Sequence, residues 1–171
     1  MTPYNRRQFR FNLFIFIVLA LAAGFWLHGH GIKGVKAPVK TDAAGLPYMT
    51  QAMYDDFAMT TPTPLLLEFG GDWCGWCHVY NPSLKRLQDS AAGRLQVYRV
   101  DAAVEPRLNN FFHVKKFPTF VILYRGKVVA QQERGFLTKF TERHGRDIII
   151  RDVVDEAAFS NWVWNSLTQA R

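Results

Sequence analysis

Apolar residues occur in one long run near the N-terminus and in many short runs after residue 49. Turn-forming residues separate the short runs from one another. Their lengths and spacings predict, in chain order, helix 50–59, strand 65–69, a helix from the first cysteine towards Ala91, strand 94–101, helix 104–114, strands 117–124 and 127–132, and helix 155–167.

The order of these elements indicates an α/β fold with a mixed central sheet. Strands 65–69 and 94–101 are joined through a helix, so we expect them to be parallel, with a right-handed crossover. Strands 117–124 and 127–132 flank a turn at 125–126 and are typical of an antiparallel hairpin. Helices would then flank the sheet on both faces.

Local signals refine three of the predicted elements. Thr50 suits the N-cap of the first helix, and the prolines within 61–64 end that helix. The run "LLLEF" at 65–69 is consistent with a strand buried on both faces. The last helix is predicted to bury one apolar stripe, formed by Ala158, Trp162 and Leu167.

The long N-terminal run has the length and composition of a membrane span. Residues 11–32 carry no charge, and a helix of that length spans about 33 Å against a hydrocarbon core of roughly 30 Å. Arginines at positions 6, 7 and 10 precede it and favour a cytoplasmic N-terminus. The sequence therefore predicts a single-pass inner-membrane protein whose domain faces the periplasm, with a basic segment at 1–10, a transmembrane anchor in the bilayer at 11–32, a linker at 33–48 and a folded domain at 49–171.

A cleaved signal peptide is the alternative to an anchor. The "ALA" at 20–22 fits a small-residue cleavage site, and cleavage there would release a secreted domain. The new terminus would begin with apolar "AGFWL", which favours retention of the segment. A buried core helix fits less well, because the run is apolar on every side.

The formal charge of +7 belongs mainly to the N-terminal region. Residues 1–40 carry six Lys and Arg and no acid, whereas residues 41–171 carry fifteen Lys and Arg and fourteen Asp and Glu. Nucleic-acid binding needs basic residues clustered on a domain. We therefore expect no nucleic-acid partner.

Cys74 and Cys77 are the chain's two thiols, and two residues separate them. A thiol reacts as its thiolate, and an ordinary pKa of about 8.5 leaves little thiolate at neutral pH. The predicted helix begins at Cys74, where unpaired backbone N–H groups and the helix dipole favour an anion. Cys77 lies on the same side of the first turn, so the pair can close a disulfide or exchange with another one.

Other roles for the cysteine pair fit the sequence less well. A zinc site needs about four ligands, and Cys74, Cys77 and His78 would need a distant histidine to complete it. A structural disulfide across so short a loop adds little stability through chain entropy. His78 could favour the thiolate when protonated, or it could be a solvated helix residue.

Two stretches within roughly residues 50–135 resemble the thioredoxin superfamily. "LLLEFGGDWCGWC" resembles the family's buried strand, acidic residue, tryptophan and CxxC motif, and "KKFPTFVILYRGKVV" resembles its cis-proline loop and hairpin. The resemblance implies a thioredoxin-like fold, preceded here by the predicted anchor. It makes Glu68 the buried acid, Pro82 the proline that kinks the active-site helix and Pro118 the cis-proline, and it places the turn Arg134-Gly135 beside the active site.

The resemblance also implies a thiol–disulfide oxidoreductase. Cys74 would attack a substrate disulfide, and Cys77 would resolve the mixed disulfide that forms. Glu68, if buried behind Cys77, would have a raised pKa and would accept the proton of that thiol. We expect the reducing direction, with a membrane electron-transfer partner and with neither a metal nor a cofactor. Oxidation or isomerisation of substrate thiols is the alternative.

The expected substrate is a protein that carries disulfides or thiols. A cis bond at Pro118 would expose the backbone of Phe117, so that an extended peptide can pair with it edgewise. Trp73, Trp76 and Phe117 would form an apolar collar around that peptide, although each could instead be simple packing.

Two features depart from the family pattern. Gly-Trp separates the cysteines where thioredoxins typically have Gly-Pro, and in this family the dipeptide helps to set the redox direction. Residues 136–155 resemble an insertion before the last helix, and "DIIIRDVV" within it would be an extra strand or a partner surface. The insertion and the linker also suit a rival function, a non-catalytic module that holds a partner at the membrane.

Overall fold

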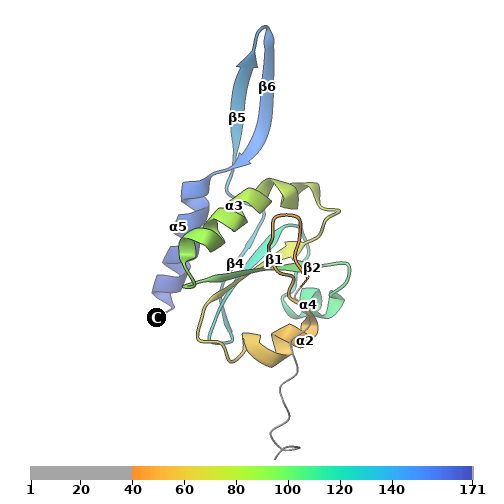
Figure 1. Cartoon of the computed structure of the whole chain (residues 1–171), viewed down its shortest axis with the longest axis vertical. Coiled ribbons are helices and arrows are strands. Elements are labelled where there is room, and N and C mark those ends of the chain that lie inside the picture. Colours follow the sequence, from red (N-terminus) through yellow and green to blue (C-terminus); the bar gives the residue numbers. More distant parts are fainter. Residues whose placement is uncertain (1–39, 171) are drawn as a thin grey trace, which may run out of the picture. The chain divides into compact units, whose positions relative to one another are not determined.

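The computed structural model describes residues 40–170, and Figure 1 shows how their helices and strands are arranged. The helical segments are α2 (Gln51–Met53), the π-helix η1 (Tyr54–Ala58), α3 (Gly75–Ala91), α4 (Pro106–Phe111) and α5 (Glu156–Gln169). The strands are β1 (Leu65–Gly70), β2 (Gln96–Asp101), β3 (Thr119–Tyr124), β4 (Lys127–Glu133), β5 (Leu137–His144) and β6 (Asp147–Val154). The α/β fold and the order of elements that the sequence predicts are confirmed up to β4.

Strands β1 to β4 form the expected mixed sheet, in the order β2-β1-β3-β4. β1 pairs in parallel with β2 and antiparallel with β3, and β3 pairs antiparallel with β4. Helix α3 connects the two parallel strands. The register places Glu68 on β1 directly beside Arg99 on β2, a pairing on which the candidate site depends.

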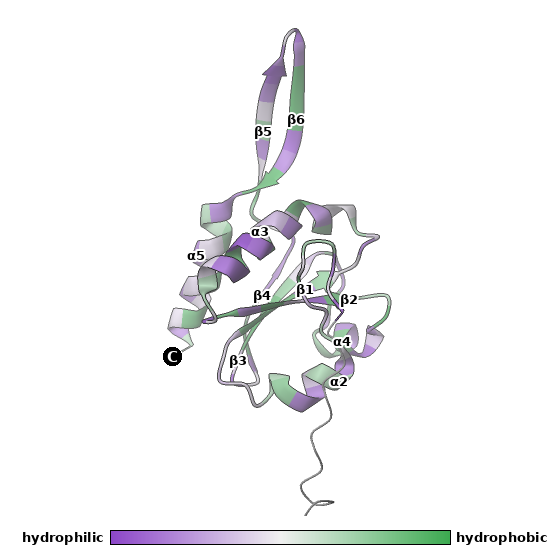
Figure 2. Cartoon of the chain, in the orientation of Figure 1, coloured by the Kyte–Doolittle hydropathy of each residue, from purple (hydrophilic) through white to green (hydrophobic). Residues whose placement is uncertain are grey.

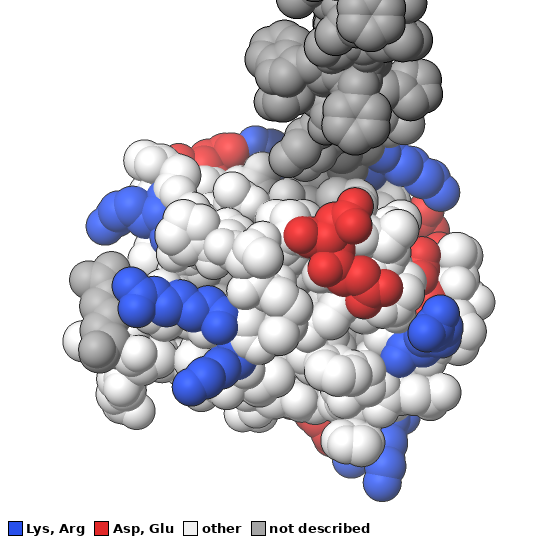
Figure 3. Space-filling model, turned by 90° about the horizontal axis from the view of Figure 1, so that it is seen from below, with Lys and Arg blue, Asp and Glu red and all other residues white. Residues whose placement is uncertain are grey.

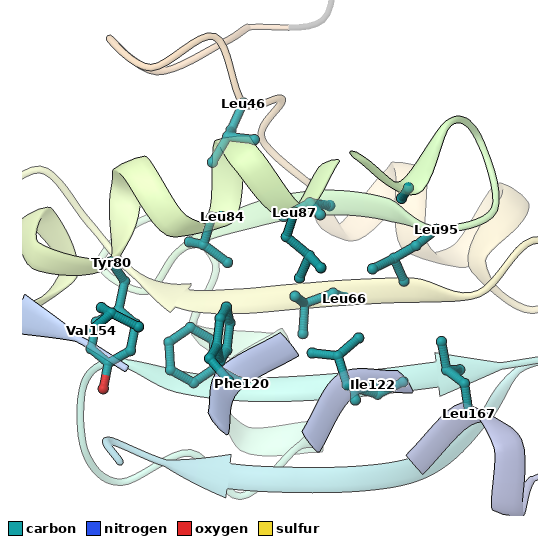
Figure 4. Close-up of a cluster of buried hydrophobic side chains, with 14 residues drawn as sticks. Leu46, Leu66, Tyr80, Leu84, Leu87, Leu95, Phe120, Ile122, Val154 and Leu167 are labelled. Carbon is teal, nitrogen blue, oxygen red and sulfur yellow. The ribbon is translucent and has the colours of Figure 1, made fainter. Parts of the chain in front are cut away.

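Helices pack against both faces of this sheet, so the central strand β1 is buried at all six positions. On one face, α3 and α5 contribute aromatic and aliphatic side chains to a cluster shown in Figure 4, which includes Leu66, Tyr80, Leu84, Phe120, Ile122 and Leu167. The cluster on the other face lies against η1 and α4 and includes Tyr54, Leu67, Phe69, Leu108 and Phe112. The prediction of a strand buried on both faces is confirmed.

Helix α3 begins at the cysteine pair and ends in a left-handed turn. Cys74 is its N-cap. Ala92 (φ 49°) and Gly93 (φ 80°) end the helix, and the left-handed backbone is one that glycine adopts without strain. Pro82 lies inside the helix, as the resemblance implies. At the start of the chain's first described helix, the Thr50 side chain accepts a hydrogen bond from the Met53 N–H (3.2 Å), which confirms its predicted role as an N-cap.

Helix α5 has nearly the predicted extent, and of the predicted buried stripe only Leu167 is confirmed. Its buried residues are Phe159, Val163 and Leu167. Ala158 and Trp162, which we predicted on the buried stripe, are only partly buried. Phe159 takes the central place because its ring packs among three aromatic rings of the core, those of Tyr80, Phe120 and Phe136.

Strands β5 and β6 form a separate two-stranded sheet that projects from the rest of the domain (Figure 1). They occupy the predicted insertion 136–155, so "DIIIRDVV" does form a strand, and the residues before it supply its partner. Figure 2 shows apolar positions along β6 in the projecting part. The exposed apolar side chains of the hairpin are Phe140, Ile148, Ile149 and Ile150.

The N-terminal part of the described chain packs against the domain. Leu46 is fully buried, Tyr48 forms a parallel bridge with Arg99, and Thr41 forms a bridge with Pro47. Residues 40–48, which we assigned to the linker, are therefore part of the folded unit. The predicted basic segment 1–10, the predicted anchor 11–32 and residues 33–39 lie outside the described residues. Within residues 40–170 no helix is long and apolar enough to cross a bilayer.

Charged side chains are distributed unevenly on the face of the domain shown in Figure 3. Lys and Arg side chains lie mostly towards the rim of this face, whereas one group of Asp and Glu atoms lies nearer its middle. On this face, the basic residues that the structure describes do not merge into a continuous strip.

Candidate active site

The two cysteines are joined at the N-terminal end of α3, with 5.3 Å between their Cα atoms. Cys74 has an extended backbone, and its Sγ accepts a hydrogen bond from the Cys77 N–H (3.2 Å). The Cys74 carbonyl accepts from the N–H groups of Cys77 (3.0 Å) and His78 (3.3 Å). A negative sulfur at position 74 would therefore meet a backbone donor and the positive end of the helix dipole.

The two sulfur-bearing residues differ in their access to solvent. Cys74 is 6% exposed, whereas Cys77 is completely buried. A large substrate can therefore reach Cys74 first, and Cys77 can act only on what Cys74 has bound. This asymmetry agrees with the order of attack that the resemblance implies.

Glu68 is buried beneath the cysteine pair on β1. Its Oε2 accepts a hydrogen bond from Arg99 Nε (2.8 Å), whereas Oε1 has no hydrogen-bond partner among the described residues. A methyl group placed on Gly70 would lie 2.8 Å from Glu68 Oε1 and would collide with Cys77 Sγ. The unpaired oxygen and the Cys77 sulfur therefore border the same small space, which only a glycine at position 70 leaves open.

Burial makes Glu68 a stronger base than an exposed glutamate. Desolvation raises the pKa of Glu68, and the positive charge of Arg99 opposes that rise without cancelling it. A carboxylate that holds a proton more firmly than usual is a better acceptor for the proton of a nearby thiol.

Arg99 is the centre of a buried ionic cluster around the carboxyl group. Its side chain is 1% exposed, and its Nη1 donates to Asp42 Oδ2 (3.0 Å) and lies 3.4 Å from Asp72 Oδ1. The Tyr48 hydroxyl donates to Asp72 Oδ1 (3.0 Å). Burial, together with this hydrogen bond, raises the pKa of Tyr48 to about 12, so the hydroxyl remains a donor. The cluster fixes the Oε2 side of Glu68 and leaves the Oε1 side free.

The Phe117–Pro118 peptide bond is cis, as expected from the resemblance. Pro118 is buried and Phe117 is partly exposed. The Thr119 hydroxyl donates to the Lys116 carbonyl (2.7 Å) and holds the loop on which the bond lies. Phe117 packs partly against the core and remains partly exposed.

Two of the three aromatic residues predicted as a collar come together. The rings of Trp73 and Phe117 meet edge to face, with 5.1 Å between their centroids. A side chain on Gly71 would collide with the Trp73 indole, so this glycine gives the indole its place. Trp76 lies apart from the pair, and the Arg134 guanidinium covers its ring at 4.6 Å.

His78 is exposed on the outer side of α3. Its Nε2 donates to the Asp72 carbonyl oxygen (2.8 Å), which closes the loop before the helix. The modulating role that we predicted for this residue stays a prediction.

Comparison with known proteins places this geometry in a family. The family model described as thioredoxin matches residues 46–141, more than half of the chain. The chain belongs to the thioredoxin family. This family match ends within β5, so β6 and α5 lie beyond it.

The relatives are themselves thioredoxins. The chain is 32% identical to Thioredoxin 1 of Chlorobaculum tepidum over 74 residues, which are 43% of this chain and 73% of the relative. It is 27% identical to thioredoxin of Haemophilus influenzae over 85 residues, 50% of this chain and 79% of the relative. With the chloroplastic Thioredoxin M4 of Arabidopsis thaliana it shares 25% identity over 105 residues, 59% of this chain and only 54% of the relative. These relatives support a thiol–disulfide oxidoreductase.

Sequence reasoning found most of this thioredoxin-family site but missed the ionic cluster. It identified the cysteine pair, Glu68 and the cis-proline. The structure brings Cys77 and Glu68 together at Gly70, and the cis-proline loop contacts the cysteine motif through the rings of Phe117 and Trp73. It gave no role to Asp42, Asp72 or Arg99. The predicted strand 94–101 carries two arginines, Arg94 and Arg99, and nothing in the sequence singles out Arg99 as the buried one.

Proposed function

We propose that this protein is a membrane-anchored thiol–disulfide oxidoreductase that reduces disulfides of extracytoplasmic proteins through Cys74 and Cys77. One observation carries the proposal: the unpaired Glu68 oxygen and the buried Cys77 sulfur border one small space beneath the more accessible Cys74. A pair that only stabilised the fold would have no need of a buried base next to the inner sulfur.

In the first step, the Cys74 thiolate attacks one sulfur of a substrate disulfide. The substrate S–S bond breaks, a bond forms between Cys74 and the attacked sulfur, and the other substrate sulfur leaves as a thiolate that takes a proton from water. The Cys77 N–H and the helix dipole stabilise the attacking anion in the reduced protein.

In the second step, Cys77 gives its proton to Glu68 and its sulfur attacks Cys74. The mixed disulfide breaks and the second substrate sulfur leaves as a thiolate, while Cys74 and Cys77 close their own disulfide. The substrate disulfide gains two electrons and the protein dithiol loses two. Glu68 then returns its proton to solvent, and a dithiol electron donor at the membrane reduces the pair again.

The aromatic surface supports a protein as the substrate. Trp73 is 56% exposed beside Phe117, and the cis bond before Pro118 leaves the neighbouring backbone available to an extended chain. Trp76, covered by the Arg134 guanidinium, is a second exposed indole next to the cysteines in the sequence. An extended segment next to a disulfide fits such a surface better than a compact small molecule does.

Residues 11–32 supply the membrane part of the proposal. Their uncharged length and the arginines before them support a retained anchor with the domain in the periplasm. Mass spectrometry of the protein from washed membranes tests this directly. We expect a chain that retains residues 11–32, and a soluble form that begins after position 22 would instead support the cleaved signal peptide.

Insulin reduction by dithiothreitol tests the catalytic proposal. The full-length wild-type protein should accelerate the reaction, because Cys74 exchanges with the insulin disulfides, and Cys74→Ser should fall to the rate of the reagent alone. Equal rates for the two proteins would contradict a catalytic role.

The direction of the reaction is decided by equilibrium against a series of glutathione buffers. A potential of about −270 mV, where thioredoxin lies, supports a reductant. A potential of about −120 mV, where DsbA lies, would instead assign the oxidising alternative.

The exposed face of the β5–β6 hairpin favours a second candidate function, a module that binds a protein partner at the membrane. Ile148 and Ile150 are 59% and 61% exposed, an unusual position for aliphatic residues in a strand. A Cys74→Ser protein that still fulfils its role in cells would assign this function in place of the catalytic one.

A further inference from the structure

Arg99 lies between two buried carboxylates, and the proposed mechanism uses only one of them. Its Nε donates to Glu68 Oε2 (2.8 Å), and its Nη1 donates to Asp42 Oδ2 (3.0 Å). The side chain of Asp42 is 1% exposed and that of Glu68 is fully buried. The Arg99 cation is therefore paired with two carboxylates that are both shielded from bulk water.

The backbone holds Asp42 in place. Its Oδ1 accepts from the N–H groups of Ala44 (2.9 Å) and Leu46 (2.8 Å). The Asp42 N–H donates to the Leu46 carbonyl (2.9 Å), and Leu46 is anchored in the core. Gly45 has a φ of 79°, the left-handed conformation that this tight turn requires. Asp42 is thus a fixed acceptor that faces Arg99, with one oxygen for the turn and the other for the guanidinium.

We propose that Asp42 is a positioning residue, which holds the Arg99 guanidinium and so sets how strongly Glu68 attracts the proton of Cys77. The inference rests on the proposed function, because it concerns the second step of that reaction. It also gives the segment before β1 a role in the chemistry, since Asp42 lies in the part of the chain that leads in from the predicted anchor.

The physical basis is the sharing of one positive charge. A cation next to a carboxylate weakens its hold on a proton, and a second carboxylate on the same cation offsets that effect. In agreement, burial is the main cause that raises the pKa of Glu68, Arg99 lowers it, and Asp42 raises it again. Asp42 therefore keeps Glu68 a stronger base than a simple pair with Arg99 would allow.

Several charged or titratable groups surround the Glu68–Arg99 pair. They are Asp42 and Tyr48 from the N-terminal segment, Arg99 from β2, Asp72 from the loop before α3, and Cys77 and His78 from α3. Asp72 is 73% exposed and lies farther from the guanidinium (3.4 Å), so solvent screens its charge. His78 is exposed and bound to a carbonyl oxygen. Of these groups, Asp42 is the other carboxylate that shares the buried environment of Glu68.

The test follows the two steps separately with 5,5′-dithiobis(2-nitrobenzoate) and the reduced full-length protein. Attack by Cys74 releases one thionitrobenzoate, and displacement by Cys77 releases the second. In Asp42→Asn we expect the first release to be unchanged. The second should slow about three- to tenfold at neutral pH, since the base is weaker, and its pH profile should shift to lower pH.

Two further variants separate charge from structure. Asp42→Glu keeps the carboxylate, so its second release should have a pH profile close to that of the wild type. Asp56→Asn removes an exposed charge from η1 and should leave both releases unchanged. A folded Asp42→Asn protein with the wild-type pH profile for the second release would overturn the proposal.

A measurement on the wild type decides the matter if Asp42→Asn does not fold. Carboxyl carbon-13 NMR follows the signals of Asp42 and Glu68 as the pH changes, and the Asp42 signal should respond where Glu68 titrates because both carboxylates contact Arg99. An Asp42 signal that does not respond where Glu68 titrates would overturn the proposal. Failure of the wild type to release the second thionitrobenzoate counts against the proposed function, and the NMR titration still decides the role of Asp42.

Discussion

The runs Leu65–Leu67 in β1 and Ile148–Ile150 in β6 are alike in sequence and opposite in structure. Every residue of β1 is buried, whereas the three isoleucines of β6 are exposed (Figure 2). β1 lies between two strands with helices on both faces, whereas within the described residues β6 pairs with β5 alone. An apolar run therefore predicts a strand, and the neighbours of that strand decide whether it is buried.

The same contrast applies to the charged residues of the two sheets. In the buried sheet, Glu68 and Arg99 face each other without access to water, so their protonation and stability depend strongly on their partners. In the hairpin, Glu142 pairs with Arg151 and Lys139 with Asp152 at sites that solvent reaches. Only the buried pair can tune the chemistry of a neighbouring sulfur.

The largest effect expected from this contrast is that of removing the buried cation. Arg99→Met removes the cation that Glu68 and Asp42 share and should lower the free energy of unfolding by about 3–5 kcal/mol at pH 7. Arg151→Met, the matched change in the exposed hairpin, should cost less than about 1 kcal/mol. Urea unfolding measures both. Equal losses would show that the burial of the pair has no energetic consequence.

Truncation of the apolar runs should give the next largest difference. Leu66→Ala removes a fully buried side chain from β1 and should cost about 2–5 kcal/mol in unfolding free energy. Ile149→Ala removes an exposed side chain from β6 and should change it by less than about 0.5 kcal/mol. Thermal or urea unfolding of the two variants checks the prediction. A loss at position 149 close to that at position 66 would mean that the hairpin is covered in solution.

The pH dependence of stability should distinguish the two sheets. A raised pKa means that folded Glu68 keeps its proton above about pH 4.3, the ordinary value for glutamate, while the unfolded chain loses it. Protonated Glu68 therefore adds fully to the free energy of unfolding below its ordinary pKa of about 4.3. This contribution is lost as the pH rises through the raised pKa of the folded state.

Glu68→Gln removes that slope, so the wild type should lose stability relative to this variant as pH rises. Unfolding measured across a pH series would show the change, with Glu142→Gln in the partly exposed hairpin pair as the control. Parallel curves for the wild type and Glu68→Gln would mean that the carboxyl group titrates normally.

The smallest effect is expected at the projecting face of the hairpin. Ile148→Ser and Ile150→Ser together should change the unfolding free energy by less than about 1 kcal/mol and leave both thionitrobenzoate releases unchanged. This result would separate the hairpin from the chemistry of the cysteine pair. A slower first release in the double variant would instead connect the hairpin with access to Cys74.

The sequence was sufficient for the parts of the molecule that depend on local pattern. The order of elements from 50 to 133, the start of α3 at Cys74 and the cis bond before Pro118 all follow from residues close together in the chain or from a family motif. Glu68 could also be assigned, because it belongs to the same short stretch as the cysteines.

The parts that were missed depend on register and on contacts between distant segments. Arg99 meets Glu68 because β1 and β2 align these two positions, and Asp42 joins them from a segment that we assigned to the linker. In α5, Leu167 is buried as predicted, but Phe159 and Val163 take the places predicted for Ala158 and Trp162, because the Phe159 ring packs among the core aromatics. The hydrophobic periodicity of the sequence indicates none of these contacts between distant segments.

The central claim is that Glu68 takes the proton of Cys77 after Cys74 has attacked, and stopped-flow release of thionitrobenzoate from the reduced full-length protein tests it most directly. For Glu68→Gln at neutral pH, we expect a first release at the wild-type rate and a second release slowed about 100-fold or more, the usual contribution of a general base. A second release that keeps the wild-type rate in Glu68→Gln would contradict the claim.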